Sequence, residues 1–284
     1  MKRILLLAFS FGMIWIFSCR KSLSEFPDPS VNDSTSVNSK PPAPLPPAQP
    51  CTAGPNYGDS IVYQQPTMAN LDYLVSPINN PGPGQYISWP QGLSIDNSTG
   101  VIDITKSETG QRYIIGFIAS GSTDTCLHPL IIGGSSYPDS IYVLAASHAF
   151  AGPYFDANPN TPSPCAGGGC HFQSMVKLSG KDVNIQDNTG IIDVQASFNG
   201  GIFGPTPVDG ETQTATIQYS LNGQSNKAIQ TMQVEFIYYG KKSSIPAALL
   251  NLIASKRAQM LTDSLISVNA NPKPPLLIIT RVAN

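Results

Sequence analysis

The chain has 284 residues and a formal net charge of −2, and only 12% of its residues are charged, against about 25% in an average soluble protein. The sequence has neither a basic stripe nor an acidic tail, which excludes the charge pattern of a nucleic-acid-binding protein. Glycine (24) and proline (26) are frequent, as in exported all-β proteins with many turns. The length leaves room for one large domain or two ordinary ones.

Residues 1–18 have the organisation of an export signal. A basic pair at positions 2–3 precedes an apolar stretch, residues 4–17, that is too short to span a bilayer as a mature helix. Ser18 and Cys19 then resemble the lipobox of bacterial lipoproteins, although a phenylalanine stands two positions before the cysteine. The resemblance implies that the signal is removed and that Cys19 carries acyl chains such as palmitate, which anchor the protein in the cell outer membrane. An ordinary signal peptide or an uncleaved anchor is the alternative.

Residues 19–50 are predicted to form a disordered tether. Proline, serine, asparagine and aspartate dominate it, and residues 41–50 are mostly proline and alanine, which favours extended polyproline II. A proline-rich recognition motif is the alternative interpretation. Arg20 and Lys21 follow the cysteine where acidic residues mark surface export in some Gram-negative groups. The periplasmic face is therefore favoured, and the surface face stays open.

From residue 51 onward, short apolar runs alternate with turn residues. β-branched and aromatic residues recur in the runs, and a turn signal follows about every ten residues. This spacing predicts antiparallel strands in a sandwich or barrel. The runs cover residues 60–65, 85–89, 92–96, 100–104, 112–120, 130–134, 140–147, 175–180, 182–186, 190–197, 212–221 and 228–240.

An internal repeat indicates how these strands are grouped. Residues 93–104 (LSIDNSTGVIDI) align without gaps to residues 183–194 (VNIQDNTGIIDV), at an offset of 90 residues. One immunoglobulin-like sandwich has about 100 residues. The repeat therefore predicts two tandem modules, residues 51–147 and residues 148–284.

The first copy also resembles a known family. Together with the preceding Pro-Gln-Gly at 90–92, it has the Pro-x-Gly-Leu-x-Ile-Asp…Thr-Gly-x-Ile run of the immunoglobulin-like and cadherin-like repeats of bacterial surface proteins. The resemblance covers residues 85–120 and implies a hairpin between two strands of a sandwich. The second copy lacks the Pro-x-Gly-Leu lead and carries a glycine-rich insertion at 198–211. The predicted fold is mainly β: two tandem immunoglobulin-like antiparallel β-sandwich modules with one C-terminal helix.

The polar residues at 96–100 could hold a metal or a sugar, or they could simply reverse the chain. In the second copy Asp96 is replaced by Gln186 and Ser98 by Asn188, while the threonine and glycine are kept. A metal site would suffer from this exchange. A turn needs only a glycine that can take a positive φ and polar residues that satisfy the turn backbone. We therefore expect a structural turn.

Four cysteines follow Cys19, and an even number in an exported chain predicts disulfides, with three connectivities open. Three glycines between Cys165 and Cys170 let that loop close on itself, so this pair is predicted first. Cys51 and Cys126 would then form the second bridge.

The residues after Ala149 form the candidate binding loop, 149–171. Loops of this length in a compact domain are usually functional or disordered, and a local disulfide favours order. Aromatic side chains in such a loop could stack on sugar rings. The candidate binding residues are Tyr154, Phe155, His171 and Phe172.

The C-terminal region contains the helical pattern. Residues 245–268 carry an apolar stripe that includes Leu250, Ala254 and Leu261, which predicts a helix lying across the second module. A membrane-surface helix is the alternative. Residues 274–282 are predicted to form a strand that closes a sheet.

No catalytic or metal-binding motif is present in the sequence. Cys165, Cys170, His171 and His148 lack the spacing of a structural zinc site, and the repeat has too few carboxylates for calcium. There is no Gly-x-Ser-x-Gly elbow, His-Glu-x-x-His helix or phosphate loop. The sequence thus predicts a non-catalytic envelope protein without cofactor or metal, whose partner is an envelope protein or a glycan. A glycan-binding accessory lipoprotein of a polysaccharide-uptake system is the alternative, and a hydrolase is less favoured.

Overall fold

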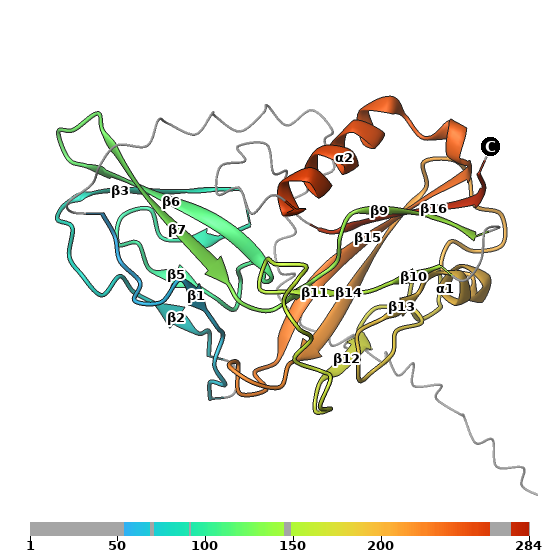
Figure 1. Ribbon diagram of the computed structural model, residues 1–284, viewed down its shortest axis with the longest axis horizontal. Helices are drawn as coiled ribbons and strands as arrows, with labels where there is room; N and C mark the ends of the chain where they lie inside the picture. Colours follow the sequence, from blue (N-terminus) through green and yellow to red (C-terminus); the bar gives the residue numbers. More distant parts are fainter. Residues whose placement is uncertain (1–53, 69–70, 91, 145–148, 262–273, 284) are drawn as a thin grey trace, which may run out of the picture. The chain divides into compact units, whose positions relative to one another are not determined.

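The computed structural model describes residues 54–68, 71–90, 92–144, 149–261 and 274–283. They build two β-sandwich modules in tandem (Figure 1). The predicted mainly β fold is confirmed. The sheets are mixed rather than purely antiparallel as predicted, since three strand pairs among the described residues are parallel. The expected signal, Cys19, the expected tether, Cys51 and His148 lie outside the described residues.

Two sheets enclose the core of the first module. The larger sheet has the order β1-β7-β6-β3, with β1 parallel to β7, and the smaller sheet has the order β2-β5-β4. Tyr86, Tyr113 and Phe117 are the largest side chains buried between them. The strands are β1 Ile61–Val62, β2 Leu74–Val75, β3 Gly84–Trp89, β4 Ser94–Ile95, β5 Ile102–Asp103, β6 Gln111–Ala119 and β7 Thr125–Ile132.

The second module is built around a mixed sheet with the order β12-β14-β15-β16-β9. Two short pairs, β10-β13 and β11-β8, accompany it. Its strands are β8 Ser135–Ser136, β9 Ser140–Val143, β10 Phe150–Ala151, β11 Tyr154–Phe155, β12 His171–Ser174, β13 Ile192–Asp193, β14 Thr212–Ser220, β15 Gln230–Lys241 and β16 Leu276–Val282. Its helices are α1 Val194–Gly200, the 3-10 turn η2 Lys242–Ser244 and α2 Ala247–Leu261.

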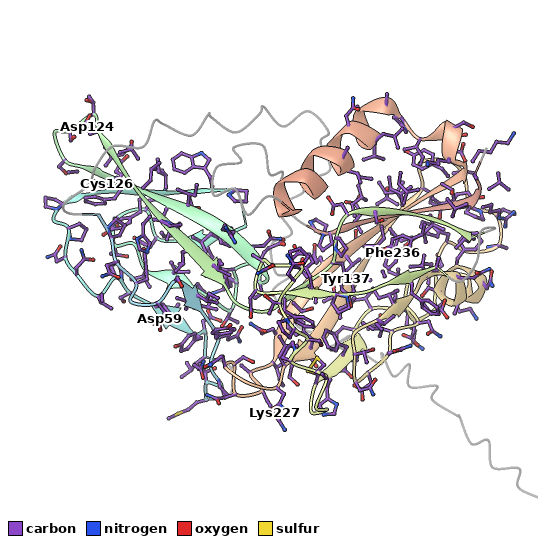
Figure 2. The ribbon with its side chains drawn as sticks, in the orientation of Figure 1. Asp59, Asp124, Cys126, Tyr137, Lys227 and Phe236 are labelled. Atoms are coloured by element: carbon purple, nitrogen blue, oxygen red, sulfur yellow. A yellow bond between two sulfur atoms is a disulfide. The ribbon has the colours of Figure 1, made fainter. Side chains whose placement is uncertain are left out.

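Alternation along β15 places apolar side chains on both faces of this sheet. Phe236 and Tyr238 pack into the larger core, with α1. Ile237 and Tyr239 pack on the opposite face, with α2. Figure 1 shows α2 running along one side of β15 and β16, with α1, β10 and β13 on the other. Figure 2 shows Tyr137 and Phe236 among the interior side chains.

Helix α2 confirms the predicted stripe in part. Leu250 packs against the sheet as expected, together with Leu249 and Ile253, whereas Ala254 is exposed. The Leu261 side chain lies outside the part of the chain that the structure describes. A spacing of three and four residues fits several adjacent stripes of one helix. In α2 the larger side chains are the ones that pack against the sheet. No helix within the described residues is long and apolar enough to span a membrane.

Three predicted strands are wrong. Residues 175–180 and 182–186 contribute only isolated bridges. Residues 190–197 begin as β13 and then form α1, because the Asp193 side chain accepts a hydrogen bond from the Ala196 amide at 2.8 Å and so caps a helix. Gly201, at φ 95°, ends this helix.

Strand pairing assigns β8 and β9 to the second module, although both precede the expected boundary at residue 147. Strand β9 pairs with β16, and β8 pairs with β11. The chain leaves the first sheet at the end of β7, and Gly134 then takes a φ of 143°. The second module therefore begins with the residues directly after this glycine.

A second repeat marks strand β1 of the first module and strand β9 of the second. Tyr-Gly-Asp-Ser-Ile at 57–61 corresponds to Tyr-Pro-Asp-Ser-Ile at 137–141, and these segments lead into β1 and β9. Strand β1 pairs directly with β7, the last strand of its module. Strand β9 does not reach its counterpart β15, because the C-terminal strand β16 lies between them and is parallel to both.

Candidate functional site

The polar turn of the first copy is a hairpin turn, as predicted, and the second copy reproduces it. Gly100 and Gly190 both have a φ of 71°, in the region where a side chain is strained. The Gly100 amide donates to the Asp96 carbonyl at 2.9 Å, and the Gly190 amide donates to the Gln186 carbonyl at 2.8 Å.

A tyrosine from the start of each module secures this glycine. The Tyr57 hydroxyl donates to the Gly100 carbonyl at 2.6 Å, and the Tyr137 hydroxyl donates to the Gly190 carbonyl at 2.5 Å. Burial raises the pKa of both tyrosines far above the ordinary value, so each hydroxyl keeps its proton and remains a donor. The turn is thus tied to the first strand of its own module, which explains why the repeat is structural.

An aromatic ring covers each glycine from the sheet side. Tyr86 lies over Gly100 and Phe172 lies over Gly190, and there is no room for a β-carbon at either position. Phe172 also stacks on Tyr219, with ring centroids 5.5 Å apart.

The two turns place their carboxylate at different positions. In the first, Asp96 Oδ1 accepts four hydrogen bonds, from the amides and hydroxyls of Ser98 and Thr99 at 2.7–2.9 Å. These bonds hold the pKa of the Asp96 carboxyl well below its ordinary value of 3.8. In the second turn the neutral Gln186 amide oxygen accepts from the Thr189 hydroxyl at 2.8 Å. The same turn therefore forms without a carboxylate at its first position, and its carboxylate is Asp187, one residue later.

A shallow groove of about 450 Å³ lies beside the first turn. It follows the outer face of the β2-β5-β4 sheet, where Leu74 pairs with Asp103 and Asp103 pairs with Ser94. Its apolar wall includes Leu74, whose exposed fraction of 57% is high for a leucine. The groove is lined by Leu74, Ser94, Ile95, Asp96, Thr99, Val101 and Asp103.

One ammonium group stands next to the carboxylates of this face. Lys106 Nζ donates to Asp103 Oδ2 at 2.7 Å and also to Asp72 Oδ2. These hydrogen bonds raise the pKa of Lys106 above its ordinary value, with Asp103 contributing most. With Asp96, the face carries three carboxylates against one ammonium.

The sequence did not reveal this face. Leu74 lies in a strand of two residues, too short to show alternation, and Asp72 is joined to Lys106 across 34 positions. The detectable signal was Asp96 itself, whose replacement by a glutamine in the second copy showed that its charge was not part of the shared turn.

The predicted binding loop does not present an aromatic surface. Tyr154 and Phe155 form β11, which pairs with β8, and both are buried. Phe172 is 2% exposed and belongs to the larger core of the second module, which also contains Phe236 and Tyr238. Of the two uses that aromatic side chains in such a loop can have, these three rings pack the loop down and do not offer a surface for stacking on a sugar. The loop is long, but it returns to the sandwich and fills its core.

His171 is the one predicted binding residue that is exposed. Its Nδ1 lies 3.3 Å from Asp187 Oδ1, and both side chains are 68% exposed. Such an exposed pair contributes little to stability. Among the residues that the structure describes, no group of three or more histidine, cysteine, aspartate or glutamate side chains could hold a metal ion.

The short disulfide is confirmed: Cys165 and Cys170 are bonded, and both are buried in the main core. Cys126 is disulfide-bonded as well. Since Cys51 lies outside the described residues, its pairing with Cys126 stays a prediction.

Comparisons with known proteins do not identify a family. No protein-family model matches the chain, and no curated protein matches it. A similar solved structure is that of Drosophila OTK, extracellular domains 3-5, with a TM-score of 0.19 and 10% identity. The match covers 65% of this chain and 65% of that one, so the chain spans about two thirds of that structure's length.

Proposed function

We propose that the protein is a non-catalytic, lipid-anchored component of the bacterial cell envelope, whose two sandwich modules serve binding or structural interaction. The observation that carries this proposal is the N-terminal pattern: a basic pair, the apolar residues 4–17, and then Ser18 and Cys19. The Pro/Ser-rich segment after Cys19 would link the lipid to the modules.

The folded body supports a role in interaction. Immunoglobulin-like sandwiches present loops and sheet faces on a rigid scaffold. In the first module such a face combines exposed apolar surface with carboxylates around Leu74 and Asp96. In the second module the aromatic side chains that suggested glycan stacking are used for packing.

Metabolic labelling tests the anchor. Cells that express the full chain are fed a palmitate analogue carrying an alkyne, and the immunoprecipitated protein is examined for label. We expect label in the wild type and in the matched control Ser22→Ala, and none in Cys19→Ala. Fractionation should place the labelled protein in the outer membrane, and protease treatment of whole cells should leave it intact if it faces the periplasm. An unlabelled wild type, or a Cys19→Ala variant that keeps the label, contradicts the proposal.

A further inference from the structure

Exposed apolar side chains gather on one short segment of the first module. Leu71, Leu74 and Ile78 are 61%, 57% and 69% exposed, whereas Tyr73 and Val75 between them pack against the core. Isolated exposed apolar residues are ordinary on a protein surface, but a group beside a groove marks an interaction site. Leu74 belongs to this exposed segment and also lines the groove, so it joins the apolar segment to the groove.

The same segment contains a sheet edge. In the order β2-β5-β4, β2 has β5 as its one strand neighbour within the described residues. Proteins usually protect an edge strand with charged residues, proline or a bulge, yet β2 consists of Leu74 and Val75. An open apolar edge is suited to an extended peptide, which adds as a further strand and places alternate side chains in neighbouring pockets.

The charge of the face selects the partner. Gln186 shows that the turn does not need a carboxylate at the position of Asp96, since the second turn has its carboxylate one residue later, at Asp187. All four hydrogen bonds within the turn end on Asp96 Oδ1. Its other oxygen accepts none of them and remains open to a donor from a partner. Asp72 and Asp103 add two charges, and Lys106 offsets one.

The second module provides the contrast. Phe150 occupies the position of Leu74, since Leu74 pairs with Asp103 and Phe150 pairs with Asp193, and Phe150 is also 48% exposed. There, Asp193 accepts the Ala196 amide as Asp103 accepts the Lys106 amide. The carboxylate of the second turn, however, is Asp187, which accepts the Phe172 amide, and Gln186 stands at the position of Asp96. Exposed apolar surface is common to both modules, and the carboxylate pair of Asp96 and Asp103 beside it belongs to the first.

We propose that the outer face of the β2-β5-β4 sheet binds an extended segment of a partner protein, one that alternates apolar residues and carries at least one lysine or arginine. The segment pairs with β2, an apolar side chain enters the groove beside Leu74, and the basic side chain bonds to Asp96. This site rests on the proposed function as an interaction protein and names the surface and the chemistry of the partner.

Two synthetic peptides serve as probes. One alternates leucine with lysine and serine over eight residues, and the other has glutamate in place of each lysine. Fluorescence anisotropy measures their binding to the full chain in detergent, and hydrogen exchange locates it. We expect the lysine peptide to protect amides at 71–75 and 101–103, and to bind at least tenfold more tightly than the glutamate peptide.

Variants separate the apolar and charged contributions. Leu74→Ser should weaken binding about tenfold, the effect of a leucine that becomes buried on binding. Asp96→Asn should weaken it about two- to fivefold, as expected for one exposed ion pair. The matched control Phe150→Ser should bind like the wild type. Cys19→Ala should also bind normally, so a failure of lipid labelling and a failure of this site are separate results.

Several outcomes overturn the site. These are no protection at 71–75 with millimolar lysine peptide, equal binding of both peptides, and equal losses in Leu74→Ser and Phe150→Ser. Self-association of the full chain that Leu74→Ser abolishes would replace the partner with a second copy of the chain. If Leu74→Ser lowers the melting temperature, Asp96→Asn decides alone, because an amide oxygen at this position still accepts from the turn, as that of Gln186 accepts from the Thr189 hydroxyl.

Discussion

The two modules share their turn and differ at one seam, which lies between β1 and β7 in the first module and between β9 and β15 in the second. In both, a buried tyrosine donates to the carbonyl of a turn glycine that an aromatic ring covers. At the seam, the first module pairs β1 with β7 over two residues, whereas the second inserts β16 between β9 and β15. The turn is therefore the invariant part of this sandwich, and the seam is the variable part.

The aspartate of the repeated segment has a different environment at the two seams. Asp59 and Asp139 occupy the same place in the repeated Tyr-x-Asp-Ser-Ile segment. Asp59 is exposed at the surface of the first module (Figure 2). Asp139 is buried, and its Oδ1 accepts the amide of Leu276, the first residue of β16, at 2.8 Å. The inserted strand has given this carboxylate a backbone partner.

Removing β16 should produce the largest difference in stability between the two modules. A chain ending at residue 275 lacks Leu276, Leu277, Ile278 and Ile279, all 5% exposed or less. Their burial stabilises the module by about 6–12 kcal/mol, which is comparable to the whole stability of a domain. We expect the second module to unfold and the first to persist, as seen by hydrogen exchange in 212–241 and in 111–132.

A shorter truncation is the matched control. Ending the chain at Thr280 removes Arg281 and Val282, which are exposed, and leaves the buried part of β16 in place. This variant should keep the exchange pattern of the full chain. If the chain ending at residue 275 also keeps it, β16 is not required to close the second sheet.

The sequence predicted the parts of this fold that depend on local pattern. The repeat at offset 90 identified the hairpin turn, because a positive-φ glycine and its polar neighbours lie within a few residues. The Cys165–Cys170 bridge was predictable for the same reason. Strand β16 was recognisable as an apolar run, but its central place between β9 and β15 depends on pairing across more than 100 residues. Nothing local records that pairing.

The candidate site was less predictable, because it depends on which side of the chain is buried. The pattern of Tyr154 and Phe155 is the same whether the rings stack on a ligand or fill a core, and the structure places them in the core. Leu74 shows the opposite case. A leucine in a strand is expected to be buried, and this one is exposed. Asp96 was noticed in the sequence, but only the structure shows that the four turn hydrogen bonds all end on one of its two carboxylate oxygens.

Substituting the turn glycines tests whether the two modules depend on their turns to the same degree. A β-carbon at Gly100 would lie 2.5 Å from the Tyr86 ring, and one at Gly190 would lie 2.8 Å from the Phe172 ring. Adding the cost of the left-handed conformation to that of overpacking, we expect each alanine variant to lose about 2–5 kcal/mol in urea unfolding. Gly121→Ala is the control, because its φ of 81° is similar but nothing lies within 4 Å. It should lose only about 1–2 kcal/mol, and equal losses at all three positions would contradict the role of the rings.

Removing the tyrosine hydroxyls tests the same two turns with a smaller change. Tyr57→Phe and Tyr137→Phe each delete one donor to a turn carbonyl and leave the ring in place. Because a buried carbonyl loses its partner, each variant should lose about 1–2 kcal/mol of unfolding free energy in thermal or urea melts. The two variants control each other. A clear loss in one and none in the other would show that the tyrosines are not equivalent, despite their matching geometry.

The smallest expected effect is the acid response of the first turn. Hydrogen bonds from Ser98 and Thr99 stabilise the Asp96 carboxylate, so its pKa in the folded protein lies below the ordinary value of 3.8. The stabilisation is fully present above that value and is lost as the pH falls through the lower folded pKa. In NMR titrations the amide shifts of Ser98 and Thr99 should stay constant from pH 7 to about pH 4 and move only in stronger acid. Asp96→Asn should abolish this transition at Thr99. A midpoint for Thr99 at the ordinary aspartate value would mean that the four hydrogen bonds do not hold in solution.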